Sequence, residues 1–240
     1  IIMNKTFLRI FKKKKIIITG HTGFKGSWLS LWLYLRGAKV LGISDKIPTN
    51  PSHFKLLNLQ KKIISKRIKI NNFNKLKKIF REFKPDYVFN LAAQSIVKKS
   101  YSNPSITWKT NLLGTLNILE CLRLQENETI AIMVTSDKAY KNIEINKGYK
   151  ETDILSGSDP YGASKSSADI CINSYVKSYF SEKRNKVFII TARAGNVIGG
   201  GDWTEDRLIP DIVKSSNLKM PTIIRNLKAT RPWQHVLDVL

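Results

Sequence analysis

Short apolar segments alternate with longer amphipathic segments along this chain, and that alternation is the strongest constraint on its fold. Each apolar segment has the length of a buried strand, whereas the amphipathic segments repeat their apolar residues at helical spacing. The predicted strands are 15–20, 39–44, 63–70, 86–92, 129–134 and 186–192. The predicted helices are 23–36, 72–83, 103–124 and one that begins at Asp159-Pro160. Asn103 and Asp159 are the expected N-caps of the last two helices, each followed by a proline in the first turn. This order predicts an α/β fold, a doubly wound parallel sheet covered on both faces by helices.

Composition excludes several classes of protein. The 240 residues are 42% hydrophobic and 25% charged, which is ordinary for a globular protein and unlike a disordered one. The two cysteines, Cys121 and Cys171, fall inside apolar helical patterns and are too few for a disulfide framework. This cysteine usage suits a reducing compartment, and we expect a cytoplasmic protein.

The net charge of +23 first suggests a polyanionic partner. The chain has 31 Lys against 10 Arg, and these are spread along it. Specific phosphate recognition favours the fork of Arg, so we expect no specific nucleic-acid partner. The longest apolar stretch, 28–35, is too short to cross a membrane, and we expect no membrane association. The basic N-terminal segment lacks a cleavable apolar region, so no secretion signal is expected.

A glycine-rich turn lies between the first predicted strand and helix. Its sequence is GHTGFKG, with Gly20, Gly23 and Gly26 at intervals of three. Glycines here permit a tight turn and a close approach of backbone N–H groups to a pyrophosphate at the helix N-terminus. Asp45 lies 19 residues beyond Gly26, near the end of the second strand. It is either a ligand for a ribose hydroxyl or an exposed loop residue.

Tyr161 and Lys165 are four residues apart on a predicted helix, so their side chains share one face. An adjacent ammonium group favours the phenolate form of a tyrosine, which otherwise is a poor base near neutral pH. Ser136 follows the fifth strand and could hydrogen-bond a substrate alcohol. Ligands of open α/β sheets bind at these carboxyl ends of strands.

Together these motifs resemble the extended short-chain dehydrogenase/reductase superfamily, and within it the CDP-glucose 4,6-dehydratases. The specific stretches are GHTGFKGSW, TSDK, YGASK and NVIGGGDW, and the similarity extends over nearly the whole chain. The resemblance implies a Rossmann-like fold with NAD as the cofactor and no metal ion. The implied cofactor-binding residues are Gly20, Thr22, Gly23, Phe24, Gly26, Asp45, Leu91, Ala92, Ala93, Tyr161 and Lys165.

The resemblance also implies roles in catalysis. Tyr161 takes the proton of the sugar O4 with help from Lys165 and Ser136, and Asp137 protonates the departing C6 hydroxyl. Related dTDP-glucose dehydratases have a Glu base where this chain has Lys138. Lys138 is either the base at C5 or a residue that only positions Asp137 or the substrate.

CDP-glucose is the implied substrate, and a homodimer or larger homo-oligomer is the implied assembly. The substrate-binding candidates are Gln94, Arg193, Asn196, Arg207 and Arg231. Residues 1–192 form mainly the NAD-binding domain, and 193–240 begin a substrate-binding lobe that continues further in the family. For His235, beside Arg231, a structural hydrogen bond is the expected role. Lys69 stands where superfamily members commonly carry an Asp that meets adenine.

Two other functions remain open at this stage. The first is another sugar-nucleotide enzyme on the same scaffold, a 4-epimerase or a dTDP- or GDP-sugar dehydratase. Asp137 disfavours an epimerase, which needs no acid for a leaving group. The second is a truncated, inactive protein whose basic surface binds polyanions.

Overall fold

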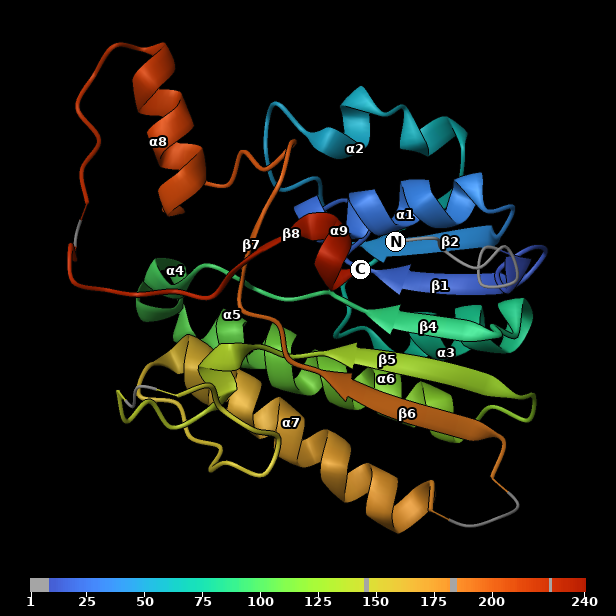
Figure 1. Ribbon diagram of the computed structural model, residues 1–240. Coiled ribbons are helices and arrows are strands. Elements are labelled where there is room, and N and C mark those ends of the chain that lie inside the picture. Colours follow the sequence, from blue (N-terminus) through green and yellow to red (C-terminus); the bar gives the residue numbers. More distant parts are fainter. Residues whose placement is uncertain (1–8, 145–146, 182–184, 225) are drawn as a thin grey trace.

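The computed structural model describes residues 9–144, 147–181, 185–224 and 226–240, and the basic segment at 1–8 lies outside these ranges. Its centre is a six-stranded sheet in the order β3-β2-β1-β4-β5-β6, with every pair parallel. The strands are β1 (Lys15–Thr19), β2 (Lys39–Ser44), β3 (Ile64–Arg67), β4 (Tyr87–Asn90), β5 (Thr129–Val134) and β6 (Val187–Ala192). This is the predicted Rossmann-like α/β fold (Figure 1).

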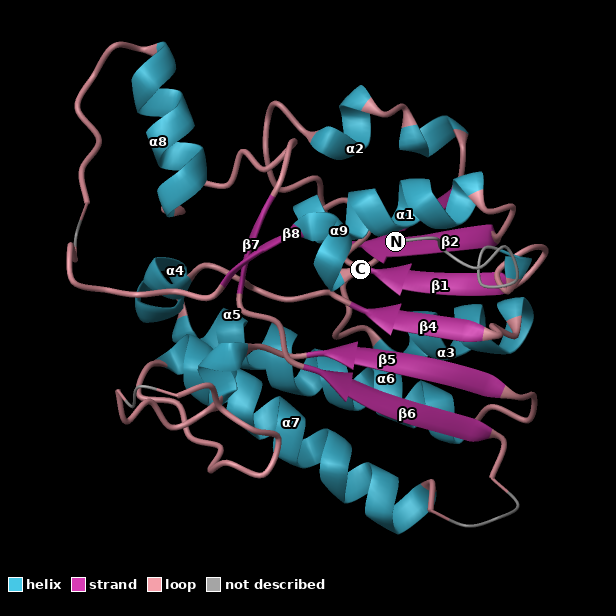
Figure 2. Ribbon diagram, in the orientation of Figure 1, coloured by secondary structure: helices cyan, strands magenta, loops and turns pink. Residues whose placement is uncertain are grey.

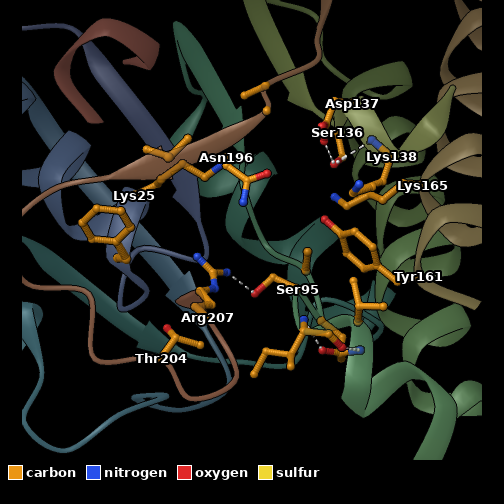
Figure 3. A pocket seen from close by; sticks show the side chains of 18 of the residues that line it. Lys25, Ser95, Ser136, Asp137, Lys138, Tyr161, Lys165, Asn196, Thr204 and Arg207 are labelled. Atoms are coloured by element: carbon orange, nitrogen blue, oxygen red, sulfur yellow. Dashed lines mark hydrogen bonds between the residues drawn. The ribbon is translucent and has the colours of Figure 1, made fainter. Parts of the chain in front are cut away.

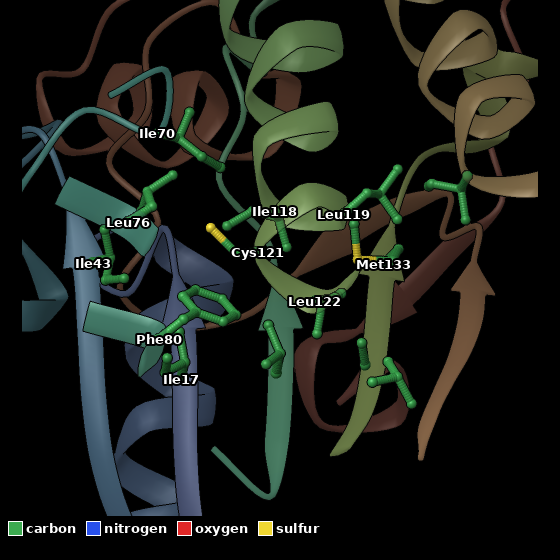
Figure 4. Close-up of a cluster of buried hydrophobic side chains, with 14 of the residues drawn as sticks. Ile17, Ile43, Ile70, Leu76, Phe80, Ile118, Leu119, Cys121, Leu122 and Met133 are labelled. Atoms are coloured by element: carbon green, nitrogen blue, oxygen red, sulfur yellow. The ribbon is translucent and has the colours of Figure 1, made fainter. Parts of the chain in front are cut away.

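Helices pack against both faces of the sheet (Figure 2). One face carries α1 (Phe24–Leu35), α2 (His53–Leu56) and the short 3₁₀ helix η2 (Leu59–Lys61) over β1–β3. The other carries α3 (Phe73–Phe83), α6 (Gly114–Arg123) and α7 (Pro160–Tyr179). On this second face Phe80, Leu119 and Met133 are almost wholly buried in one cluster (Figure 4).

One face of the edge strand β6 is exposed in the described part of the chain. Phe188 and Ile190 point to the face opposite α6 and α7, and each is 54% exposed. Alternation along the strand places these two side chains on one side and Val187 and Ile189 on the other. No helix of the described chain lies over Phe188 and Ile190, whereas Val187 and Ile189 pack against the cluster on the α7 side.

The predicted helix at 103–124 is interrupted. It consists of α5 (Pro104–Trp108), a π-helical segment η3 (Lys109–Leu113) and α6. A helix that was not predicted, α4 (Val97–Ser102), precedes it and ends at Asn103. Asn103 therefore closes α4 and makes no side-chain cap to α5, contrary to expectation. Asp159 does cap α7, because its carboxylate accepts hydrogen bonds from the backbone N–H groups of Tyr161 and Gly162.

The segment after β6 forms a separate two-stranded parallel pair, β7 (Asn196–Ile198) with β8 (Trp233–His235). Between them lies α8 (Leu208–Asn217), which buries none of its described side chains and projects away from the sheet (Figure 1). His235 precedes α9 (Val236–Val239), and its ring nitrogen accepts a hydrogen bond from Leu237, so the structural role expected for it is confirmed. No helix among the described residues is long and apolar enough to span a membrane.

Replacing Leu119 with Ala should lower the free energy of unfolding by about 2–5 kcal/mol, because the substitution leaves a cavity in a fully buried cluster. Leu124→Ala, at a position that is 44% exposed, is the matched control and should change it by less than about 0.5 kcal/mol. Urea unfolding followed by circular dichroism measures both. Equal losses in the two variants would contradict the placement of α6.

Candidate active site

The glycine-rich turn fits a phosphate-bearing ligand because side chains are excluded from it. Gly20 has a φ of +75°, and a Cβ there would lie 2.9 Å from the backbone nitrogen of Ala92. A Cβ on Gly26 would lie 2.1 Å from the carbonyl oxygen of Gly20. Gly23 precedes α1 and supplies no side-chain cap, so the first N–H groups of a twelve-residue helix remain for an anion. Phe24 is the first residue of that helix.

His21 and Thr22 hold this turn against the neighbouring strands through contacts that no local pattern predicted. The His21 ring lies 3.0 Å from Ser44 Oγ and 2.7 Å from Ser65 Oγ, and packs where a Cβ of Gly42 would stand. Burial lowers the pKa of His21 to about 4, so the ring is neutral at physiological pH. Thr22 Oγ1 donates to the carbonyl oxygen of Lys46 at 2.6 Å.

Other predicted cofactor residues lie at the carboxyl ends of neighbouring strands. Asp45 follows β2 and is exposed, and Leu91, Ala92 and Ala93 follow β4. The Ala92 backbone N–H donates to Thr19 Oγ1 at 3.1 Å, which holds this segment against β1. All four residues line the same large cavity as the glycine turn, and so does the exposed Lys69.

The predicted catalytic residues meet on the opposite wall of this cavity. Asp137 and Lys138 lie in the 3₁₀ helix η4 (Asp137–Ala139), and Ser136 is the residue before this helix. Ser136 Oγ lies 3.0 Å from Asp137 Oδ1 and accepts a hydrogen bond from the Lys138 backbone at 3.2 Å. Figure 3 shows the Tyr161 hydroxyl pointing toward Lys165 and Ser136. The Lys165 ammonium group donates to the Val134 carbonyl oxygen at 3.3 Å.

Burial dominates the electrostatics of the pair on α7. Tyr161 is 9% exposed and Lys165 is 6% exposed. Burial raises the pKa of Tyr161, and a hydrogen bond with Ser136 opposes that shift by favouring the phenolate. Burial and, to a smaller extent, repulsion from Lys25 lower the pKa of Lys165 to about 8, although Asp169 acts in the opposite direction.

Lys25 is a site residue that the sequence analysis missed. It lies between Phe24 and Gly26 in the glycine turn, and its side chain extends toward Asn196 (Figure 3). Its pKa is lowered to about 8, mainly by burial and to a smaller extent by repulsion from Arg207. Asp137 and Asp202 act in the opposite direction. The lysine in the glycine turn was the available signal, but only the fold shows that it faces the catalytic groups.

Two residues after β6 enter the same cavity. Asn196 is half-buried in β7. Arg207 donates to Ser95 Oγ at 3.0 Å and to the Asp202 carboxylate at 3.3 Å, which holds its guanidinium group at the cavity wall. The cavity is open to solvent, and its volume of about 3440 Å³ exceeds the roughly 300–1,000 Å³ of ordinary small-molecule pockets. It has room for two ligands at once.

The other three substrate-binding candidates also line the cavity, but they differ in exposure and in their hydrogen-bond partners. Arg193 forms a bidentate ion pair with Asp169, with N···O distances of 2.8 and 2.7 Å. The Gln94 carboxamide binds its own loop, donating to Thr107 and Ile96 and accepting from the Ile96 backbone. Arg231 is exposed and donates to the Thr230 carbonyl oxygen. Their substrate roles stay predictions.

A family profile described as "GDP-mannose 4,6 dehydratase" matches residues 17–240 of this chain. The chain belongs to this family. A CDP-glucose 4,6-dehydratase of Salmonella typhimurium is 45% identical over 230 residues, which cover 95% of this chain and 64% of that protein. A dTDP-D-glucose 4,6-dehydratase of Dictyostelium discoideum is 30% identical and is covered over 54% of its length. The chain therefore spans roughly half to two thirds of these relatives.

Solved structures agree with this membership. An epimerase of Methanothermobacter thermautotrophicus superposes with a TM-score of 0.84 at 27% identity, over 97% of this chain and 67% of that one. A UDP-glucose 4-epimerase of Thermus thermophilus, solved in complex with NAD, gives a TM-score of 0.78 at 25% identity. That match covers 93% of this chain and 71% of the Thermus chain.

Replacing Lys25 with Met should raise the pKa of Lys165 above about 8, because one of the two effects that lower it is removed. The pH dependence of Lys165 acetylation, followed by peptide mass spectrometry, measures this shift. Lys75→Met changes an exposed lysine of α3 and is the matched control, which should leave the Lys165 midpoint in place. A midpoint that does not move in Lys25→Met would contradict the proximity of Lys25 and Lys165.

Proposed function

We propose that the protein catalyses the NAD-dependent dehydration of CDP-glucose to CDP-4-keto-6-deoxyglucose. One observation carries this proposal: a carboxyl group, Asp137, lies 3.0 Å from Ser136 in the cavity that Tyr161 and Lys165 also face. An alcohol oxidation needs only a base and its helpers, whereas a dehydration also needs an acid for the departing hydroxyl. The 45% identity with a CDP-glucose 4,6-dehydratase supports the choice of substrate.

NAD would be held between the glycine turn and the ends of β2, β4 and α7. Gly20, Gly23 and Gly26, with Thr22 and Phe24, would bind the pyrophosphate through backbone N–H groups at the start of α1. Asp45 would accept from a ribose hydroxyl, and Leu91, Ala92 and Ala93 would contact the nucleoside. When bound, the cofactor supplies the acceptor for a hydride from the sugar and later its donor.

Tyr161 performs the first proton transfer by taking the proton of the sugar O4 as C4 is oxidised to a ketone. Ser136 hydrogen-bonds Tyr161, which favours the phenolate. The Lys165 ammonium group lies on the same face of α7 and favours it too. Burial works against ionisation of Tyr161, so these two groups are needed to make it a base near neutral pH.

Elimination then requires a base at C5 and an acid at C6. The new C4 ketone acidifies the C5–H, and the C6 hydroxyl leaves as water once Asp137 has given it a proton. Hydride returns to C6 and C5 regains a proton, so the net change is the loss of one water. Lys138 follows Asp137 and is either the C5 base or a residue that positions Asp137 or the substrate.

The sugar nucleotide would lie against the segment that follows β6. Arg207 offers a planar donor group to the diphosphate, and Asn196 faces the same space. Arg231 and Gln94 are the remaining candidates, whereas the guanidinium group of Arg193 is already paired with Asp169. In this proposal residues 1–192 form mainly the cofactor-binding domain, and residues 193–240 begin the substrate-binding lobe.

A homo-oligomer is proposed from the exposed apolar side chains on one set of helices. Ile106 of α5 and Ile170 of α7 are 56% and 55% exposed, and Tyr101 of α4 is 65% exposed. Exposed apolar groups on adjacent helices are typical of protein–protein interfaces.

A 4-epimerase is the second candidate function, favoured by the structural similarity to a UDP-glucose 4-epimerase.

Asp45 predicts that NAD binds more tightly than NADP, by at least about tenfold, because the carboxylate would repel a 2′-phosphate. Titration of the full-length protein with each cofactor, followed by tryptophan fluorescence, measures the preference. Asp45→Asn should reduce the preference for NAD over NADP. Glu126→Gln, at an exposed position in another loop, should leave this preference unchanged. Tighter binding of NADP by the parent would overturn the assignment of Asp45.

Asp137→Asn should separate oxidation from elimination, because the amide keeps the size of the side chain but cannot give a carboxyl proton. With CDP-glucose, near-ultraviolet absorbance from the reduced nicotinamide should rise and persist, while the 4-keto-6-deoxy product forms at least about 100-fold more slowly. Tyr161→Phe is the matched control, and should block the absorbance change as well as the product.

Product formation at the parental rate by Asp137→Asn would place the acid elsewhere. If the parent instead yields a sugar inverted at C4, the protein is a 4-epimerase and the proposed dehydration is wrong. Both variants belong in the full-length protein, because the described chain spans 64% of the Salmonella dehydratase.

A further inference from the structure

A buried ion pair lies behind the catalytic residues, and the proposed chemistry does not use it. Asp169 of α7 is 4% exposed at its side chain and Arg193 is 16% exposed. Arg193 Nε and Nη2 donate to the two carboxylate oxygens of Asp169 at 2.8 and 2.7 Å. This bidentate geometry uses the planar fork that lysine lacks.

Each partner of this pair also holds a segment next to the catalytic residues. Thr135 Oγ1 donates to Asp169 Oδ2 at 2.8 Å, and Thr135 immediately precedes Ser136. Arg193 Nη1 donates to the Tyr140 hydroxyl at 2.9 Å, and Tyr140 immediately follows η4. The two residues therefore hold the 136–139 segment from both of its ends.

The backbone on either side of Arg193 reinforces this arrangement. Thr135 N–H donates to the Ala192 carbonyl oxygen at 2.8 Å, and Asp137 N–H donates to that of Ala194 at 3.2 Å. The residues that carry Ser136 and Asp137 thus pair with the chain around Arg193. A displacement of Arg193 would be transmitted to both.

The same face of α7 supplies three successive contacts with the end of β5. Tyr161, Lys165 and Asp169 are spaced at intervals of four, which places them one above another on the helix. The Tyr161 hydroxyl faces Ser136 (Figure 3), Lys165 donates to the Val134 carbonyl oxygen and Asp169 accepts from Thr135. Asp169 is the member of this row that also fixes the next strand through Arg193.

We propose that the Asp169–Arg193 ion pair is a positioning element of the active site, which sets the placement of Ser136, Asp137 and Lys165 relative to Tyr161. Arg193 in this role acts through Asp169 and Tyr140 and does not bind the sugar nucleotide. The inference rests on the proposed function, because it concerns the residues assigned to that reaction.

The charge of Asp169 gives this role a measurable signature in the titration of Lys165. The charged and titratable groups around Lys165 are Lys25 of α1, Tyr161 and Asp169 of α7, and Asp137 and Lys138 after β5. Asp169 raises the pKa of Lys165 against burial and against Lys25. Without that carboxylate Lys165 loses its proton at a lower pH, and the ammonium form that assists Tyr161 is lost earlier as pH rises.

The test compares Asp169→Asn, Arg193→Gln and Arg193→Lys in the full-length protein, with kcat and KM for CDP-glucose measured against pH. Asp169→Asn should lower kcat by about 10- to 100-fold and shift the alkaline limb to lower pH. Arg193→Gln should lower kcat with KM nearly unchanged, and Arg193→Lys should restore part of the loss. Neutralising the exposed pair Lys78–Glu82 of α3 is the matched control and should change neither constant.

A selective rise in KM for Arg193→Gln would show that Arg193 binds substrate and would overturn the proposal. So would parental kcat and an unmoved alkaline limb in folded, NAD-binding variants. If Asp169→Asn does not fold, Thr135→Val removes one hydrogen bond to Asp169 and keeps its charge. That variant should lower kcat without moving the alkaline limb, and an unchanged kcat would overturn the proposal.

Failure of the proposed function gives a different result. In that case the parent yields no 4-keto product from CDP-glucose, and the placement of Lys165 is read from the pH midpoint of its acetylation by mass spectrometry. Asp169→Asn should lower this midpoint. An unchanged midpoint would overturn the positioning role independently of the substrate.

Discussion

The parallel pairing of β1 with β2 and β4, and of β4 with β5, is the constraint on which the candidate site depends. Parallel strands end at one edge of a sheet, so residues that follow different strands meet there. This pairing places the glycine turn after β1, Asp45 after β2, Ala92 after β4 and Ser136 after β5 around one cavity. A slip of any strand would move its loop out of the cavity and reverse its buried face.

Two lysines are buried at this edge of the sheet, where burial disfavours their charged forms and nearby carboxylates favour them. Burial lowers the pKa of both Lys165 and Lys25 to about 8, together with repulsion from Lys25 in the first case and from Arg207 in the second. Asp169 opposes this for Lys165, while Asp137 and Asp202 oppose it for Lys25. The carboxylates of the cavity therefore keep the two lysines closer to their ordinary pKa than burial alone would allow.

Local patterns in the sequence were sufficient for the sheet and for most of the helices that cover it. The strand at 39–44 and the Asp159 cap of α7 were predicted correctly, since each depends on adjacent residues. Asn103 does occupy the N-cap position of α5, but its side chain makes no capping hydrogen bond there. The pattern did not reveal that the same residue ends α4. The exposed face of β6 could not be foreseen, because burial of a strand face depends on contacts with segments distant in the sequence.

The candidate site likewise combines features that local patterns predict with features that they do not. The glycine turn and the Tyr161–Lys165 spacing are local signals, and the structure brings both to one cavity. Lys25, His21 and the pairing of Arg193 with Asp169 depend on contacts between distant segments. Arg193 illustrates the limit: its chemistry suits a phosphate, yet its guanidinium group binds a carboxylate of α7.

Following the C4 hydrogen of the substrate tests the central claim most directly. The full-length protein is incubated with CDP-glucose deuterated at C4, and the product is examined by mass spectrometry and NMR. Oxidation, elimination and hydride return within one cavity predict a 4-keto-6-deoxy product that carries the deuterium at C6. A product that keeps the deuterium at an inverted C4, or no conversion by a folded protein with NAD bound, would contradict the account.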